Sequence, residues 1–505
     1  MNQLKAGAAL NYVVIILNML VGLLYTPYML RMMGQSEYGL YSLVASVISY
    51  LTVLDLGLGN AIVRYTAKFR AEGKTTDQYE MFGMFLVLYV IIGVIAFAAG
   101  LGLYFNVDTL FGATMTVEEL DKARIMMLFL IFNLAVTFPM SIFGSIITAY
   151  ERFVFPKAVN IVRVVLNTVI MICLLEVGYK AVAMVILQTV FNILTLVINF
   201  IYCKYKLKIK IFFRNFKWGF LKEVAVYSFW IFLNVIMDRI YWSTGQFVLG
   251  AFVGTAAVAV FAIAIQLEQI YMQFSTAIAG VFLPKVTGMI ARNDNRKDIS
   301  NLFIRTGRIQ YIVIALILTG FIVFGRDFIN LWAGADYNSA YVITLLFFVS
   351  LSIPMIQNLG ITILQARNQL KFRSLLYIAI ASVSLIFQII LSKRYGGVGC
   401  AISIAGALFL GQGLIMNIYY HKKQDLDILV FWREILKMSG IPIILCLGAM
   451  YLLRNISLDN WLSLGLAIGV FAIVYIPLFF YFSMNQSERD LFIKPVTSII
   501  RKIKR

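Results

Sequence analysis

The chain has 505 residues, of which 61% are hydrophobic and 13% are charged, and its formal net charge is +19. So apolar a composition leaves no room for a soluble catalytic domain and indicates an integral membrane protein. The positive charge would suggest nucleic-acid binding in a soluble protein. Here it lies in short connections between apolar stretches, so no nucleic-acid partner is expected.

Fourteen apolar stretches follow one another, and most have the ~20 residues that a bilayer-spanning helix needs. We therefore predict an all-α integral membrane protein with about 14 transmembrane helices. They are expected over residues 8–30, 39–63, 81–106, 125–149, 158–178, 181–202, 224–253, 255–283, 302–325, 338–365, 374–392, 397–420, 438–453 and 461–484. Lys and Arg fall mostly in alternate connections, so both termini are predicted to be cytoplasmic.

Signals of enzymatic chemistry are missing from the sequence. It holds one histidine, His421, four scattered cysteines without a CxxC pair, and neither a GxxxxGK[ST] nor an HExxH motif. The largest connection on the outer side, about 107–122, is short and acidic. We predict that the protein is not an enzyme and uses no metal or other cofactor.

The sequence repeats itself weakly after about 216–221 positions. Asn18 and Tyr25 in the first predicted helix recur as Asn234 and Tyr241 in the seventh, which has the same orientation. Parallel repeats of this kind occur in secondary transporters, whose substrate sites lie between the halves. The alternative is that apolar helices resemble each other by composition.

The predicted parts are an amino-terminal six-helix bundle (1–202), a basic cytoplasmic linker (203–222), a carboxy-terminal six-helix bundle (223–420), two additional transmembrane helices (421–484) and a basic cytoplasmic tail (485–505).

Polar side chains inside the predicted helices indicate contact with water or substrate, because lipid-facing positions do not tolerate them. They form faces on the first, seventh and eighth helices, with single charges in the second and fifth. We predict an aqueous cavity between the first, second, seventh and eighth helices. The candidate residues are Asn18, Tyr25, Asp55, Arg163, Asn234, Asp238, Arg239, Tyr241, Trp242, Glu268, Gln269 and Gln273.

These groups also have structural interpretations. Arg163 can reach the cytoplasmic head groups with its long side chain. Asp55, close to Arg64, can cap the helix or form an ion pair, and Asp238 and Arg239 can pair with neighbouring helices. The amides can form hydrogen bonds between helices.

Two stretches carry a resemblance to a known family. Residues 30–41 read LRMMGQSEYGLY, and residues 55–61 read DLGLGNA, followed by Arg64-Tyr65. Together they resemble the amino-terminal signature of the polysaccharide transporter family, within the multidrug/oligosaccharidyl-lipid/polysaccharide exporter (MOP) superfamily. The segments around Pro284 and at residues 331–334 are also similar to that family.

The resemblance implies a pair of six-helix bundles in the bacterial cytoplasmic membrane that open alternately to each face. It implies a flippase that moves undecaprenyl-diphosphate-linked oligosaccharide repeat units, such as those of O-antigen and lipopolysaccharide, to the outer leaflet. The expected partners are this lipid-linked substrate, the bilayer, and a polysaccharide polymerase with its assembly proteins.

Such a substrate assigns roles to the polar residues. Arg163 and Arg239 should hold the diphosphate, with Arg305 and Arg308 as cations at the cytoplasmic entrance to the ninth helix. Aromatic residues such as Tyr25, Tyr241, Trp242 and Tyr271 should stack on sugar faces. The predicted helices contain these two arginines but three carboxylates, those of Asp55, Asp238 and Glu268, so their net charge is negative if all are ionised. Either a carboxylate is protonated at some stage, as in proton-coupled antiport, or the entrance cations capture the anion. We favour protonation of Glu268, with Asp55 and Asp238 in coupling or gating.

Three other functions remain open. A lipid II flippase shares the fourteen-helix plan. A cation-coupled multidrug exporter fits an acidic cavity, although that family usually has twelve spans. A scaffold for polymerisation machinery leaves the charges inside the membrane without a purpose.

Overall fold

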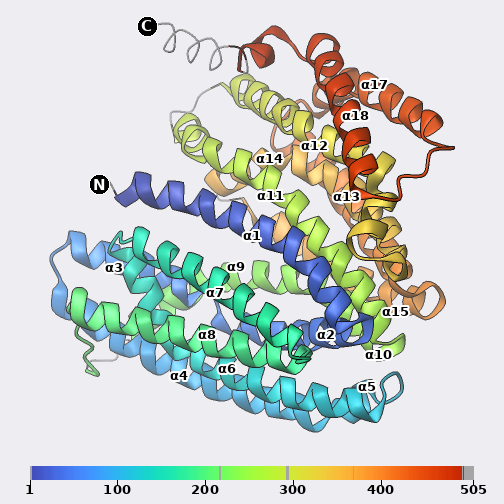
Figure 1. Ribbon diagram of the computed structural model, residues 1–505. Coiled ribbons are helices and arrows are strands. Elements are labelled where there is room, and N and C mark those ends of the chain that lie inside the picture. Colours follow the sequence, from blue (N-terminus) through green and yellow to red (C-terminus); the bar gives the residue numbers. More distant parts are fainter. Residues whose placement is uncertain (1–2, 215–217, 292–294, 368, 492, 494–505) are drawn as a thin grey trace, which may run out of the picture. The chain divides into compact units, whose positions relative to one another are not determined.

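The computed structural model describes residues 3–214, 218–291, 295–367, 369–491 and 493, and within these ranges its secondary structure is entirely helical (Figure 1). Among the described residues, twelve helices are long and apolar enough to cross a membrane. The prediction of an all-helical, multi-pass membrane protein is therefore confirmed. The number of fourteen spans and the cytoplasmic termini stay predictions.

The helix count differs from the prediction for two local reasons. The predicted helices 374–392 and 397–420 lie in one helical stretch, Lys371–Lys423, which bends at Gly396 with a φ of 55°. The predicted seventh helix, 224–253, corresponds to two elements, α9 (Trp218–Trp242) and α10 (Thr244–Phe252), and is not among the twelve.

The chain forms two compact units. Unit 1 comprises residues 1–262 with 388–400, and unit 2 comprises residues 263–387 with 401–505. Unit 1 contains α1 (Gln3–Met33), α2 (Gln35–Leu51), η1 (Thr52–Asp55), α3 (Leu58–Ala71), α4 (Thr75–Phe105), α5 (Val107–Phe111), α6 (Val117–Ala149), α7 (Val154–Glu176), α8 (Ala181–Ile201), η2 (Tyr202–Lys206), α9, α10 and the start of α11 (Thr255–Ala291). The predicted boundaries of the six-helix bundles rest on the sequence repeat and stay a prediction.

In unit 1, α4, α6 and α8 lie side by side (Figure 1). Close approach of α4 and α6 requires a glycine, because a Cβ atom on Gly93 would lie 2.8 Å from the carbonyl oxygen of Ala135. The amide of Asn192 joins α8 to α6 by donating to Asn133 Oδ1 at 2.7 Å and to Thr137 Oγ1 at 2.8 Å. Small residues and shared hydrogen bonds thus hold these helices together.

The second predicted helix is broken. The α-helix α2 ends at Leu51, a 3-10 turn follows as η1, and Leu56 (φ 53°) and Gly57 (φ 72°) adopt left-handed conformations before α3 begins. Glycine takes this conformation without steric cost, whereas the leucine does not. The glycines after Asp55 allow either close backbone approach or a break in the helix; the structure shows the break, which leaves Asp55 at a helix end inside a predicted span.

Unit 2 is organised around α12 (Arg296–Trp332), which packs against α13 (Ser339–Ile356), α17 (Ile428–Leu452) and α18 (Trp461–Phe482). The other elements of this unit are the rest of α11, η3 (Ala335–Tyr337), α14 (Asn358–Ala366), α15 (Lys371–Leu408) outside residues 388–400, η4 (Phe409–Ile415) and α16 (Met416–Lys423). Buried Met438, Tyr475 and Phe479 form an apolar cluster with Tyr311 and Leu316 of α12. The two additional carboxy-terminal helices are therefore part of the core of unit 2.

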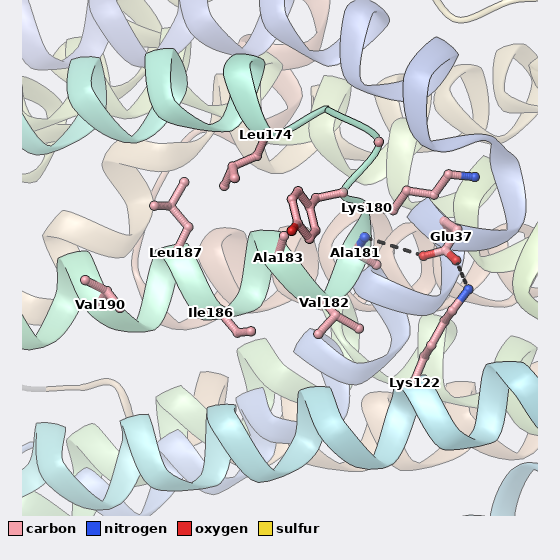
Figure 2. Close-up of a pocket in the computed structure, with 12 residues that line it drawn as sticks. Glu37, Lys122, Leu174, Lys180, Ala181, Val182, Ala183, Ile186, Leu187 and Val190 are labelled. Atoms are coloured by element: carbon pink, nitrogen blue, oxygen red, sulfur yellow. Dashed lines mark hydrogen bonds and ion pairs between the residues drawn. The ribbon is translucent and has the colours of Figure 1, made fainter. Parts of the chain in front are cut away.

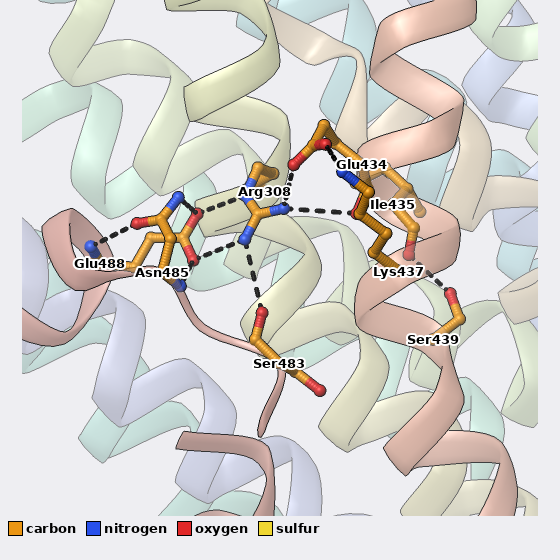
Figure 3. A network of polar contacts seen from close by, with 8 residues as sticks. All are labelled: Arg308, Glu434, Ile435, Lys437, Ser439, Ser483, Asn485 and Glu488. Atoms are coloured by element: carbon orange, nitrogen blue, oxygen red, sulfur yellow. Dashed lines mark hydrogen bonds and ion pairs between the residues drawn. The ribbon is translucent and has the colours of Figure 1, made fainter. Parts of the chain in front are cut away.

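Arg308 of α12 forms ion pairs with Glu434 of α17 and with Glu488, which follows α18 (Figure 3). Its guanidinium donates from Nε to Glu488 Oε1 at 2.5 Å, from one terminal nitrogen to Glu488 Oε2 at 2.9 Å, and from the other to Glu434 Oε2 at 2.8 Å. Lys437 pairs with Glu434 as well. The side chains of Arg308 and Glu488 are only 7% and 1% exposed, so the predicted entrance cation Arg308 is buried in an ion pair.

The ion-pair network generates a stability prediction. Arg308→Ala should lower the free energy of unfolding by about 3–5 kcal/mol, because it leaves the Glu488 carboxylate buried without its cation. Arg305→Ala, one helical turn away and exposed, should change it by less than about 0.5 kcal/mol. Thermal or denaturant unfolding in detergent micelles measures both. Equal losses for the two variants would contradict this account of Arg308.

Candidate functional site

Asp55 is held by a tyrosine at the break between α2 and α3. The hydroxyl of Tyr89 on α4 donates to Asp55 Oδ1 at 3.0 Å, and Tyr89 itself is fully buried. Asp55 therefore has a side-chain partner on a neighbouring helix at the break, and its gating role stays a prediction.

The α9 helix packs against η1 and α3, so it lies next to the Asp55 break. On α9, Arg239 is half-buried, and its buried Nε has no hydrogen-bond partner within the described residues. Tyr241 is buried beside Trp242, with 6.4 Å between their ring centroids. The side chains of Asn234 and Asp238 lie outside the described residues.

The predicted polar face of α1 is only partly enclosed. Asn18 is exposed, whereas Tyr25 is half-buried and its hydroxyl has no hydrogen-bond partner in the part of the chain that the structure describes. The α7 helix packs against α1 and carries Arg163, which is half-buried. Unit 1 thus holds two half-buried arginines and a tyrosine hydroxyl that could donate to a polar ligand.

In unit 2 the most unusual ionisable group is Glu268 on α11. Its side chain is fully buried, and neither carboxylate oxygen has a hydrogen-bond partner among the described residues. Gln269 and Gln273, on a different face of the helix, are exposed. An ionised carboxylate buried without a partner costs several kcal/mol, so this group needs a proton or a cation.

Tyr271, one turn from Glu268, is engaged in packing instead. Its hydroxyl hydrogen-bonds with Ser352 at 2.8 Å, and its ring stacks on Phe348 with 4.0 Å between centroids. These contacts fix α11 to α13 within unit 2. The contacts of Tyr271, rather than any of Glu268 itself, therefore hold this part of α11 against α13.

A well-defined pocket of about 490 Å³ lies between α7 and α8 (Figure 2). Apolar side chains such as Leu174, Ile186 and Leu187 line most of it, and a Glu37–Lys122 ion pair closes one end. The backbone N–H of Ala181, at the start of α8, also donates to Glu37 at 3.4 Å. The lining contains none of the residues predicted from sequence.

Comparison with known proteins identifies the family. Residues 4–288 match the family described as "Polysaccharide biosynthesis protein". The chain belongs to this family. A curated relative, "Uncharacterized membrane protein EpsK" of Bacillus subtilis (strain 168), is 19% identical over 495 residues, which cover 96% of each chain.

Solved structures show the fold of this polysaccharide biosynthesis protein. "Lipid II flippase MurJ, inward closed conformation" matches with a TM-score of 0.68 and 18% identity, covering 94% of this chain and 99% of that one. An inward-facing multidrug resistance transporter of the MATE family matches with a TM-score of 0.60 and 15% identity, covering 77% and 96%. The family member therefore has the fold of MOP-superfamily transporters rather than that of an enzyme, and the resemblance seen in the sequence is confirmed.

Sequence reasoning missed Glu37, which lies inside the amino-terminal stretch that carries the family resemblance. The sequence of that stretch indicates the family, but it does not show which residues Glu37 contacts. Its partners, Lys122 and Ala181, lie in α6 and at the start of α8. The available signal was a carboxylate at a helix start, a position that favours negative charge.

Proposed function

We propose that this transporter is a flippase that moves undecaprenyl-diphosphate-linked oligosaccharide repeat units across the bacterial cytoplasmic membrane by alternating access, for surface polysaccharide biosynthesis. One observation supports the proposal above the others. Inside apolar helices of a polysaccharide biosynthesis family member, Arg239 and Glu268 bury polar atoms that have no partner among the described residues. Groups of this kind are costly in a membrane, and they are typical of substrate and ion pathways.

The chemistry of such a substrate fits these groups. A diphosphate with several sugars cannot cross hydrocarbon unaided, since buried unpaired charge and unsatisfied hydroxyls are both costly. Guanidinium groups bind phosphate oxygens through planar, charge-assisted hydrogen bonds, which is the role proposed for Arg163 and Arg239. Tyr25, Tyr241 and Trp242 would pack on sugar rings, with Asn18, Asn234, Gln269 and Gln273 bonding the hydroxyls. The polyprenyl tail would stay in lipid.

The coupling proposal concerns the carboxylates. We propose that Glu268 takes up and releases a proton during the cycle, so that the substrate anion is exchanged for protons, and that Asp55 and Asp238 respond at the helix break. Arg305, which is exposed, is the entrance cation in this scheme. Arg308 is left out, because Glu434 and Glu488 already neutralise it.

Deleting the gene in its own host tests the cargo. Lipid-linked repeat units should accumulate in the inner leaflet while the surface glycan disappears, because synthesis continues and translocation stops. Radiolabelled lipid extracts, with leaflet access tested by a membrane-impermeant enzyme, measure the accumulation. Accumulation of the peptidoglycan precursor would indicate a lipid II flippase instead, and drug sensitivity alone would indicate a multidrug exporter.

Arg239→Ala should abolish surface glycan when it replaces the native protein. Loss of one charge-assisted contact to the diphosphate is worth about 1.5–3 kcal/mol, or roughly 10–100-fold in affinity. The amount of protein in the membrane should stay near normal, and Arg239→Lys should retain part of the activity. Arg394→Ala, an exposed arginine, serves as control. Disappearance of the Arg239→Ala protein from the membrane would assign Arg239 a structural role.

Glu268→Gln should leave the protein folded and remove the pH dependence of transport. The amide has the shape of the protonated acid but cannot exchange a proton, so the variant should be locked in one protonation state. Glu268→Asp should restore a pH dependence. Transport into vesicles across a range of pH values measures both variants. A pH profile of Glu268→Gln that matches the native protein would rule out a coupling role for Glu268.

A further inference from the structure

One end of unit 1 holds a carboxylate that three different elements share. Glu119, in the first turn of α6, forms a capping box with Thr116: its Oε2 accepts from the Thr116 N–H at 2.9 Å and from the Thr116 hydroxyl at 3.1 Å. Its other oxygen, Oε1, accepts from the hydroxyls of Ser36 at 2.5 Å and Thr255 at 2.8 Å. We call Ser36, Glu119 and Thr255 the outer latch.

The backbones of α2 and α11 approach each other closely at the outer latch. A Cβ atom on Gly39 of α2 would lie 1.9 Å from the carbonyl oxygen of Thr255, so only glycine fits there. Beside it, the hydroxyl of Thr114 donates to the carbonyl oxygen of Gly250 at 2.5 Å. The start of α11 therefore packs directly against α2, and the end of α10 packs against the connection before α6.

The sequence repeat gives this contact a meaning. The α2 and α6 helices belong to the predicted amino-terminal half, whereas Thr255 belongs to the predicted carboxy-terminal half, so separation of these halves would part helices that pack together within unit 1. The distribution of basic residues predicts that this end of the helices lies on the extracytoplasmic side. A transporter of alternating access must separate its halves at that side in order to release cargo outward.

We propose that the outer latch holds the extracytoplasmic side of the transporter closed, and that the bonds from Ser36 and Thr255 to Glu119 break when it opens. The proposal deepens the proposed function and rests on its alternating access. The two carboxylate oxygens have separate tasks. Oε2 keeps the start of α6 capped in both the closed and the open state. Oε1 loses its two protein hydroxyls on opening and accepts hydrogen bonds from water at the membrane surface instead.

Glu37, which follows Ser36 in the chain, supplies the matched comparison. It pairs with Lys122 of α6 and accepts from Ala181 of α8, as Figure 2 shows. These contacts all lie within the predicted amino-terminal half, so they need not break when the halves separate. We therefore expect Glu119, and not Glu37, to control the opening of the extracytoplasmic side.

Distance measurements on the purified protein test the latch without any cargo. Spin labels on cysteines introduced at the exposed positions Ala113 and Ala256, with the exposed Cys173 replaced by serine, report the separation across the latch in lipid nanodiscs. Glu119→Ala should raise the fraction of molecules with a wide separation about tenfold, because charge-assisted hydrogen bonds are lost from the closed state alone. Thr116→Ala, which removes only the cap, and Glu37→Gln should leave the distribution unchanged.

An unchanged distribution in Glu119→Ala overturns the proposal. Should that variant fail to fold, the pair Ser36→Ala with Thr255→Val removes the same two bonds and keeps the cap, and the same shift is expected of it. A shift seen equally in Glu37→Gln would also overturn the proposal, since the effect would then be general loosening. Failure of the cargo test combined with a shift in Glu119→Ala would keep the latch and change only the substrate.

Discussion

A membrane-spanning helix can carry an ionisable side chain only if that group finds a partner, reaches water or serves the function. This constraint sorts the charges of the present structure. Arg308 is completely satisfied by Glu434 and Glu488, and it ties the carboxy-terminal helices to α12. Glu119 is satisfied by the hydroxyls of Ser36 and Thr255. Glu268 is buried without a partner among the described residues. The arrangement of partners, rather than the residue type, is therefore what makes Glu268 a candidate for a functional role and Arg308 a structural charge.

The helix break after Asp55 obeys the same constraint in the backbone. A helix that ends inside a predicted span exposes carbonyl and N–H groups, which hydrocarbon does not satisfy. Here the break is packed against α4 and α9, and Tyr89 donates to the carboxylate beside it. Irregular backbone at this depth occurs where protein or a water-filled cavity surrounds it. The break is thus consistent with a substrate pathway next to α9, where Arg239 lies.

Much of this architecture could be predicted from the sequence, because apolar length and the effect of glycine are local. The helices of the predicted spans and the break at Gly57 needed no tertiary information. The setting of Arg308 could not be predicted, since its carboxylate partners lie 126 and 180 residues further along the chain. Glu119 shows both cases. Its capping box with Thr116 is visible as a T-x-x-E pattern, whereas the hydroxyls of Ser36 and Thr255 reach it only in the folded chain. Local sequence patterns therefore identify Glu119 as a capping residue, but they do not show its contacts with distant parts of the chain.

The position of a group along the membrane normal decides what it can do in a cycle. The two states of an alternating-access transporter must differ by only a few kcal/mol, or one of them is never populated. Two charge-assisted hydrogen bonds, at about 1.5–3 kcal/mol each before water replaces them, fall in that range. A contact of this kind at the surface can therefore open and close repeatedly. The Glu268 side chain is fully buried, and ionising such a carboxylate alone costs more than this range allows. Hydrogen-bonded gates thus belong at the ends of the helices, and proton or ion exchange belongs at their centre.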